Sequence, residues 1–294
     1  MVDSLSGLGE VSEKKQVISF DLFDTLVYRS DLNSEQIIML ACQYAASQIK
    51  RLVNQEVEPS QILIKRKTLQ ASLKSVPSFP TEEPTLVRVY VAIFRAFGVS
   101  GHEAIQASKL VCEFELTMEL EGLRLYEDSM PLLNRFADNA KTLVVTSDMY
   151  YDELQVRWLL RNLGVEPFFK HVLVSSSFGK KKESGSLFRA LPSLLEVKPE
   201  DILHIGDNKY SDVYQSVKTG IDAVYVDRKP ETGKGRVEGK NNDSECLDSI
   251  VLDVFLSFVA RIAMWARQDG VARLYFLARD ATGIKKLVHD CRAE

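Results

Sequence analysis

The chain has 294 residues, of which 45% are apolar and 27% are charged. These proportions match an average soluble globular protein, so they exclude a disordered or fibrous chain, and the length indicates roughly two domains. Lys and Arg number 37 against 41 Asp and Glu, which gives a net charge of −4. Dedicated nucleic-acid-binding proteins usually carry a basic excess, so we expect no nucleic-acid partner.

The patterns that mark secreted and membrane proteins are weak in this chain. Its first residues lack a basic start followed by an apolar block, which predicts no secretory signal. The most apolar stretch, residues 250–266, contains Asp253 and Arg261, and two charges there predict no membrane span. The cysteines form no CxxC pair, which is typical of a reduced compartment. We therefore expect a cytoplasmic protein.

Five short apolar runs predict β-strands. They are continuously apolar, as expected for strands covered by helices on both faces, and they span residues 16–21, 142–147, 171–175, 202–206 and 223–227. Helical patterns, for example over residues 152–163 and 186–195, separate the last four. This alternation predicts an α/β fold, a Rossmann-like parallel sheet with helices on both faces.

The segment between the first and second predicted strands has a mostly helical pattern, with candidate helices over residues 34–53, 85–97 and 103–120. A crossover between parallel strands needs only about a dozen residues, so the surplus predicts an inserted helical cap subdomain. We assign residues 31–123 to the cap and residues 15–30 with 124–228 to the α/β core. Ser34 is the expected N-cap of the first cap helix.

The composition changes after the last predicted core strand. Residues 229–245 are polar and contain several glycines, which predicts a linker. Residues 246–294 then read as a helix–strand–helix extension, with a sixth strand candidate over 272–277. We interpret this extension as the start of a further region.

Polar side chains collect where the predicted strands end. In an open parallel sheet, ligands bind outside the carboxyl ends of the strands. The first strand ends at Asp21, with Asp24 and Thr25 shortly after it, and the second ends at Ser147. Lys182 follows the third strand, and Asp207 and Asp212 follow the fourth. A single aspartate there is usually a turn or cap residue, but the ordered set predicts a catalytic site.

This set of residues resembles the motifs of the haloacid dehalogenase-like hydrolase superfamily, most of whose members are magnesium-dependent phosphatases. The resemblance covers about residues 15–228. Asp21, within FDLFDTLV, matches the family's aspartate nucleophile, and Ser147 matches its second-motif hydroxyl, with Thr146 as the alternative register. Lys182 matches the third-motif lysine, because Phe188 follows it at the family's spacing.

The fourth motif and the metal site follow from the same resemblance. Asp207 and Asp212, within GDNKYSD, match the acidic fourth motif. The resemblance implies one Mg²⁺ ion held by Asp21, the carbonyl of Phe23, Asp207 and Asp212. It also implies an aspartyl-phosphate formed on Asp21 and a small phosphorylated metabolite as substrate, such as a sugar phosphate or a nucleotide-linked intermediate.

The chemistry explains why such a site needs cations. At an effective dielectric constant of about 20, one pair of like unit charges 4 Å apart repels by about 4 kcal/mol. A carboxylate that attacks a phosphate dianion therefore faces a repulsion of about 8 kcal/mol. A magnesium ion and the ammonium group of Lys182 would offset that repulsion. The hydroxyl of Ser147 would donate a hydrogen bond to a phosphoryl oxygen.

One position departs from the family's pattern. Family phosphatases usually carry an acid two residues after the nucleophile, which protonates the leaving group. Here that residue is Phe23, and an aspartate comes one position later, at Asp24. Three interpretations stay open: Asp24 replaces the acid, the leaving group needs no acid, or the site is catalytically weak.

The aromatic residue at position 23 also resembles true dehalogenases, so a hydrolytic dehalogenase is one alternative function. Asp207 argues against it, because the resemblance attaches a metal site to that motif. A non-catalytic module that binds a phosphorylated ligand or holds partner domains is the other alternative.

The variants FDxFDT and SDMY, together with YFLARDATG at residues 275–283, resemble a bacterial subgroup of this superfamily. Members of that subgroup are often joined to glycosyltransferase regions in surface-polysaccharide biosynthesis. The resemblance therefore implies a glycosyltransferase domain or protein as a further partner.

Four other polar residues are expected to have structural roles. Glu115 and Glu119 lie one helical turn apart and are expected on a solvated helix face. His204 lies inside an apolar strand and is expected to be a hydrogen-bonded core residue. Asp148 is expected to cap the helix that follows it.

Overall fold

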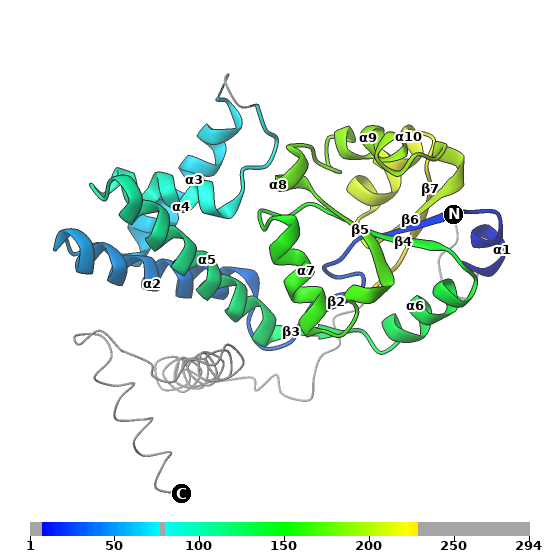
Figure 1. Ribbon diagram of the computed structural model, residues 1–294, viewed down its shortest axis with the longest axis horizontal. Helices are drawn as coiled ribbons and strands as arrows, with labels where there is room; N and C mark the ends of the chain where they lie inside the picture. The colour runs from blue at the N-terminus through cyan, green and yellow to red at the C-terminus, as the bar shows by residue number, and fades with distance from the viewer. Residues whose placement is uncertain (1–7, 77–79, 229–294) are drawn as a thin grey trace, which may run out of the picture. The chain divides into compact units, whose positions relative to one another are not determined.

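The computed structural model describes residues 8–76 and 80–228, and its centre is a parallel β-sheet. Five strands have the order β5-β4-β1-β6-β7 (Figure 1). Their bounds are Val17–Phe20 for β1, Thr142–Ser147 for β4, Phe169–Val174 for β5, Ile202–Gly206 for β6 and Asp222–Tyr225 for β7. All four pairings are parallel. The α/β class predicted from the sequence, with helices flanking a parallel sheet, is confirmed.

Helices cover both faces of this sheet. Successive residues of a strand point to opposite faces, so each strand contributes to two apolar layers. Phe20 and Val145 share one layer with residues of α6 (Ser129–Asp138) and α7 (Glu153–Asn162). Val17 and Val144 share the other with residues of α9 (Ser186–Leu195). The shorter helical elements are α1 (Leu8–Glu13), η2 (Glu166–Phe168), α8 (Ser175–Phe178), η3 (Pro199–Asp201), η4 (Lys209–Tyr214) and α10 (Gln215–Lys218).

The strand order brings three chain segments to one edge of the sheet. β1 is central and pairs with β4 on one side and with β6 on the other. Phe20, the last residue of β1, pairs with Val145 and with Ile205. The segments that leave the carboxyl ends of β1, β4 and β6 are therefore neighbours.

Four helices lie between two short strands. The sequence indicated helices in this segment but not the two strands. β2 (Val27–Arg29) and β3 (Leu123–Leu125) pair antiparallel, and α2 (Ser34–Val53), α3 (Pro59–Lys74), α4 (Leu86–Ala96) and α5 (Gly101–Gly122) occupy the chain between them. We call α2–α5 the helical insertion; the four helices form a group beside the part that contains the sheet (Figure 1). The predicted linker 229–245, extension 246–294 and sixth strand lie outside the described residues.

The N-cap predicted for α2 is one residue wrong. Asn33, and not Ser34, has the extended backbone of a cap, and its side chain accepts a hydrogen bond from the backbone N–H of Gln36. The Gln36 side chain in turn accepts from the backbone N–H of Asn33 at 2.9 Å. This reciprocal capping box explains why the helix begins where it does.

The carboxylates of Glu115 and Glu119 are fully buried, so the prediction that they are solvated is wrong. Arg66 of α3 donates two hydrogen bonds to Glu115 of α5, at 2.6 and 2.8 Å, and Tyr90 of α4 donates to the same carboxylate at 2.9 Å. Glu119 pairs with Arg29 of β2 at 2.6 Å. The partners lie far away in the sequence, so the sequence pattern of α5 alone could not reveal them.

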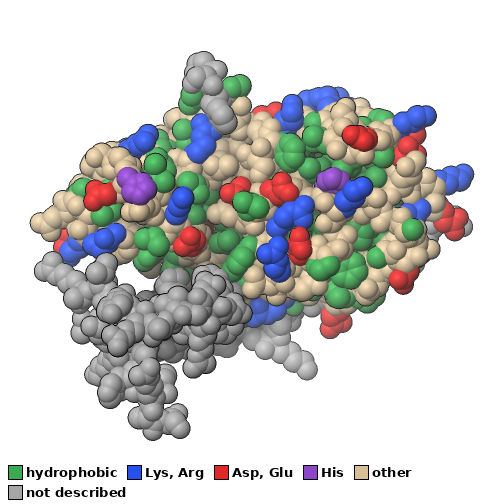
Figure 2. Space-filling view, viewed as in Figure 1, with side chains coloured by type: hydrophobic (Ala, Val, Ile, Leu, Met, Phe, Trp, Pro, Cys, Tyr) green, Lys and Arg blue, Asp and Glu red, His purple; other side chains and the backbone are tan. Residues whose placement is uncertain are grey.

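The surface shows no large patch of one charge on the face in view. Acidic and basic side chains alternate with hydrophobic ones across it (Figure 2). Among the described residues, no helix combines the length and apolarity needed to cross a membrane.

The Arg66–Glu115 pair yields a stability prediction. Removing one member of a buried ion pair leaves the other charge without compensation, which typically costs about 3–5 kcal/mol. We expect Arg66→Ala to lower the free energy of unfolding by about that amount, measured by urea denaturation followed by circular dichroism. Lys65→Ala, at the exposed neighbouring position, is the control and should change it by less than about 0.5 kcal/mol. Equal effects of the two variants would contradict the role of the pair.

Candidate active site

Asp21 lies at the centre of the candidate site, directly after β1. Its backbone N–H donates to the carbonyl of Ile205 in β6 at 2.9 Å, which fixes the residue at the edge of the sheet. Only 7% of the residue is exposed. Its Oδ1 accepts a hydrogen bond from Nζ of Lys182 at 2.5 Å. A buried carboxylate is thus held against an ammonium group.

Lys182 joins two segments of the chain by binding two carboxylates. Besides Asp21, its Nζ donates to Oδ1 of Asp212 at 2.6 Å. Burial alone would lower the pKa of this lysine, but the two carboxylates more than offset that effect and raise it above its usual value. Lys182 is therefore a permanent cation.

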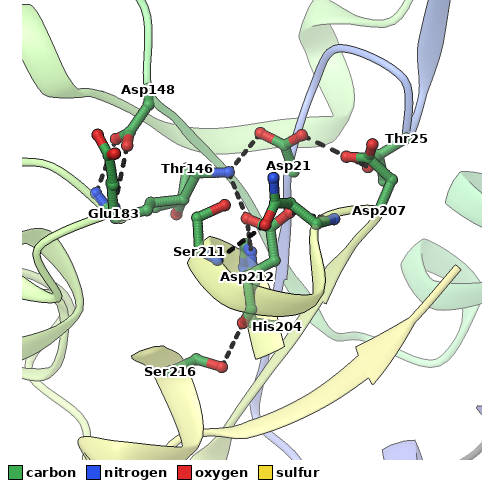
Figure 3. Close-up of polar contacts among 12 residues, drawn as sticks. Asp21, Thr25, Thr146, Asp148, Glu183, His204, Asp207, Ser211, Asp212 and Ser216 are labelled. Carbon is green, nitrogen blue, oxygen red and sulfur yellow. Dashed lines mark hydrogen bonds and ion pairs between the residues drawn. The ribbon is translucent and has the colours of Figure 1, made fainter. Parts of the chain in front are cut away.

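Asp207 completes a group of three carboxylates. Asp21, Asp207 and Asp212 each offer an oxygen, and these oxygens lie within 4.8 Å of one another. The hydroxyl of Thr25 lies between two of them, at 3.5 Å from Oδ2 of Asp21 and 3.3 Å from Oδ1 of Asp207. Figure 3 shows the three side chains pointing toward one another from different elements. One lysine therefore faces three carboxylates.

The pKa values show where this negative charge is uncompensated. Burial raises the pKa of Asp21 to about 7, and the Asp212 carboxylate adds to the increase. The pKa of Asp207 is also raised, first by burial and then by the charges of Asp212 and Asp24. Asp212 differs: Lys182 and His204 outweigh its burial and hold its pKa well below the usual range.

The donor set fits a hard divalent cation. Carboxylate oxygens are the ligands that Mg²⁺ prefers. The three carboxylates each offer one oxygen within 4.8 Å of the other two, so they converge on one place. With one ammonium group among three carboxylates, a divalent ion would balance the charge. The residues present therefore fit the ion that the family resemblance implies.

The local fold explains how Asp212 reaches the site. It lies in η4, a single π-helical turn, and π-turns are often found at functional sites. Asn208 caps this turn by accepting from the N–H groups of Tyr210 and Ser211. A Cβ atom on Gly206 would lie 2.4 Å from Cγ of Asp212. Only glycine at position 206 lets the carboxylate pack this close to the strand.

His204 is a fully buried core residue, as the sequence indicated, but it also contacts the site. Its Nδ1 lies 2.9 Å from the hydroxyl of Ser19, and its Nε2 lies 3.3 Å from Oδ1 of Asp212. The Ser19 hydroxyl continues the chain to Thr146 at 2.8 Å. A hydrogen-bonded row thus runs through the sheet beneath the carboxylates.

Thr146 and Ser147 lie on opposite faces of β4. Thr146 shares a face with Ser19 and His204, to which its hydroxyl is linked. Ser147 is the last residue of the strand and is 2% exposed. Its hydroxyl makes no hydrogen bond to any part of the chain that the structure describes. It is therefore available to a ligand, whereas the Thr146 hydroxyl is already engaged.

The segment after Asp21 bends sharply. Asp24 has a φ of 58°, in the left-handed region, and its backbone N–H donates to the carbonyl of Val27 at 2.7 Å. The Asp24 side chain is exposed, and its charge raises the pKa of Asp207, so it lies near the same edge. Phe23 is half-buried, with the guanidinium of Arg29 stacked 4.5 Å from its ring centre.

Asp148 has a role that the sequence did not indicate. It does not cap α7, because Asp152 does so. Its two carboxylate oxygens instead accept hydrogen bonds from the backbone N–H groups of Lys182 and Glu183, at 2.7 and 3.1 Å (Figure 3). Asp148 thus fixes the backbone of the site lysine. Its position directly after Ser147 was the one available sequence signal.

A family comparison agrees with this geometry. The family model described as haloacid dehalogenase-like hydrolase matches residues 15–213. The fold is that of an α/β protein with three carboxylates and a lysine at one edge of its sheet, and the family match shows that the chain belongs to the haloacid dehalogenase-like hydrolase family. The matched range contains Asp21, Lys182, Asp207 and Asp212.

Curated relatives and solved structures add detail. A glyceraldehyde 3-phosphate phosphatase from Pyrococcus furiosus is 35% identical over 63 residues, 21% of this chain and 26% of the relative. One of the same name from Methanopyrus kandleri is 25% identical over 162 residues, 55% of this chain and 66% of the relative. The matches thus span less than two thirds of either relative.

The crystal structure of a 2-haloacid dehalogenase from Pseudomonas syringae has a TM-score of 0.52 at 18% identity. The match covers 76% of this chain and 91% of that chain. At this identity, the similarity shows the shared fold alone.

Proposed function

We propose that this protein is a Mg²⁺-dependent phosphohydrolase that acts on a small phosphorylated metabolite through an aspartyl-phosphate on Asp21. The observation that carries the proposal is the contact of Lys182 with both Asp21 and Asp212, beside Asp207, at one edge of the sheet. Membership of the hydrolase family supports the reaction class. The names of the two curated relatives support a phosphate ester as the substrate.

The reaction would proceed in two displacements at phosphorus. An Asp21 carboxylate oxygen attacks the phosphorus atom, the bond from phosphorus to the leaving oxygen breaks, and that oxygen takes up a proton. Water then attacks the same phosphorus, breaks its bond to Asp21, and releases inorganic phosphate and a proton. The first displacement uses the negative charge of the Asp21 carboxylate, and the second restores it.

The cations of the site act on the negative charge. Lys182 holds Asp21 in place and offsets part of the repulsion between this carboxylate and the phosphoryl group. Asp21, Asp207, Asp212 and the carbonyl of Phe23 would hold the Mg²⁺ ion, which supplies Lewis-acid neutralisation of the phosphoryl oxygens when bound. The unpaired hydroxyl of Ser147 would donate a hydrogen bond to one of those oxygens.

Asp24 fits a local role better than the role of the missing acid. Asp and Asn are the residues besides Gly that adopt the left-handed conformation most readily, and Asp24 has that conformation. Its side chain is exposed, whereas an acid must meet the leaving oxygen inside the site. We therefore do not assign protonation of the leaving oxygen to Asp24.

The helical insertion would act as the cap of this enzyme, with residues 31–123 as the cap and 15–30 with 124–228 as the core. Its position between β2 and β3, close after the Asp21 segment, supports this assignment. A cap of this kind excludes bulk water and contacts the leaving group, so it would determine which metabolite binds.

The proposal extends to the natural substrate and to a partner. A sugar phosphate is supported by the names of the curated relatives, and a nucleotide-linked intermediate is the alternative. The motif variants at Asp21 and Ser147 support the surface-polysaccharide subgroup, in which a glycosyltransferase domain or protein would be the partner.

Two other functions compete with this proposal. Phe23 favours a hydrolytic dehalogenase, which would need neither the metal nor Asp207. A module that only binds phosphorylated ligands has no physical need for Lys182 between two buried carboxylates, because burying these charges is costly. Sensitivity of turnover to a chelator separates the phosphohydrolase from the dehalogenase, and a module that only binds would show no turnover.

The first test of the proposal is hydrolysis of p-nitrophenyl phosphate by the full chain. We expect turnover with Mg²⁺, its loss in EDTA and its recovery when Mg²⁺ is added back. Asp21→Asn should lower kcat at least about a thousandfold, because it removes the nucleophile. Asp138→Asn, the same change at an exposed position of α6, should leave kcat unchanged. Turnover that survives EDTA, or survives in Asp21→Asn, would refute the proposal.

The second test concerns Asp24. Asn tolerates the left-handed conformation, so we expect Asp24→Asn to change kcat/KM by less than about threefold. The change should be equal for p-nitrophenyl phosphate and for an alkyl phosphate such as glycerol phosphate. A loss of about 10²–10⁴-fold confined to the alkyl phosphate, whose leaving group needs a proton, would identify Asp24 as the general acid.

A further inference from the structure

The loop that carries Lys182 is held from two sides. We call Gly179–Gly185, between α8 and α9, the lysine loop. From the core, Asp148 accepts hydrogen bonds from the N–H groups of Lys182 and Glu183. Gln215 also donates to the carbonyl of Glu183 at 2.9 Å. These contacts come from the same part of the chain as Asp21.

The second set of contacts comes from the helical insertion. The connection between α3 and α4 includes Thr81–Glu83, which we call the strap. Glu82 Oε2 accepts hydrogen bonds from the hydroxyl of Ser184 and from the N–H of Lys181, the latter at 3.3 Å. The N–H of Glu82 donates to the carbonyl of Gly179 at 3.1 Å. The strap thus contacts both ends of the lysine loop.

Two more contacts support the strap. Glu83 Oε2 lies 3.2 Å from Nζ of Lys181. A Cβ atom on Gly179, which has a φ of 63°, would lie 3.3 Å from the hydroxyl oxygen of Thr81. The backbones therefore approach closely where the strap meets the loop. The pKa of Glu82 lies below its usual value, because the hydrogen bonds it accepts outweigh the effect of its burial.

We propose that Glu82 is a positioning residue, which holds the lysine loop in its catalytic arrangement only while the helical insertion is docked on the core. This inference rests on the proposed function, since it takes Lys182 as the group that acts on the phosphoryl oxygens. Asp148 holds the loop from the core, whereas Glu82 belongs to the helical insertion. Closing the insertion over a substrate then completes the site.

The geometry explains why a small movement matters. Lys182 Nζ lies 2.5 and 2.6 Å from its two carboxylate partners, and both contacts are buried. The loop residues on either side of Lys182, Lys181 and Ser184, are those that Glu82 binds. A misplacement of about 1 Å at a catalytic group can cost about a hundredfold in rate.

The first measurement is amide hydrogen exchange across residues 179–186, compared between the full chain and Glu82→Ala. We expect faster exchange in the variant, including at Lys182 and Glu183, whose amides bind Asp148 and not Glu82. Glu103→Ala, the same change at an exposed position of α5, should leave exchange in this loop unchanged. Unchanged exchange in Glu82→Ala would overturn the inference.

The second measurement is the effect on p-nitrophenyl phosphate hydrolysis. Glu82→Ala should lower kcat about tenfold with KM within about twofold, and Glu82→Gln, whose amide oxygen still accepts, should recover most of the loss. A kcat of Glu82→Ala within about twofold of that of the full chain would overturn the inference.

The two measurements separate failure of the inference from failure of the proposed function. A full chain that does not hydrolyse phosphate esters refutes the proposed function, and hydrogen exchange still decides whether Glu82 holds the loop. An active chain whose kcat and loop exchange are insensitive to Glu82→Ala keeps the proposed function and refutes the inference.

Discussion

The contact of one buried ammonium group with two buried carboxylates determines the arrangement of the rest of the site. Lys182 comes from the loop after α8, Asp21 from the end of β1, and Asp212 from the π-turn after β6. Each charge would be costly to bury alone, so the three segments must meet together. The strand order makes this meeting possible, because β6 pairs directly with the central strand β1.

The same constraint explains features that have no catalytic group of their own. Gly206 has no side chain because the Asp212 carboxylate occupies that space. The carboxylates of Asp148 and Glu82 accept hydrogen bonds from backbone N–H and hydroxyl groups of the lysine loop. The helical insertion also contains a buried ion pair, in which Arg66 and Glu115 join two helices. These positioned charges add to the apolar packing, since one hydrophobic cluster contains residues of both the insertion and the core.

The sequence predicted the core well because its signals are local. Continuous apolar runs marked the five strands of the sheet, and the polar residues that end them marked the edge where Asp21, Lys182, Asp207 and Asp212 meet. The failures involve partners that are distant in the sequence. Glu115 and Glu119 looked solvated because Arg66 and Arg29 lie on other elements.

The sequence pattern also could not predict the shortest strands or the exact N-cap of α2. The three-residue strands β2 and β3 are too short to show a periodicity. Asn33 and Ser34 are both good capping residues, so their neighbours decided between them. The contacts of Asp148 and Glu82 with the lysine loop depend on tertiary structure that no spacing encodes.

The aspartyl-phosphate mechanism depends most directly on where water attacks. A single turnover of excess enzyme with a phosphate ester and Mg²⁺ in oxygen-18 water, followed by mass spectrometry, answers this. This mechanism predicts label in the released phosphate and none in the peptide that contains Asp21, because water attacks phosphorus. Label in the carboxylate of Asp21 would mean that water attacked its carbon, as in hydrolysis of a carbon ester intermediate, and would contradict the account.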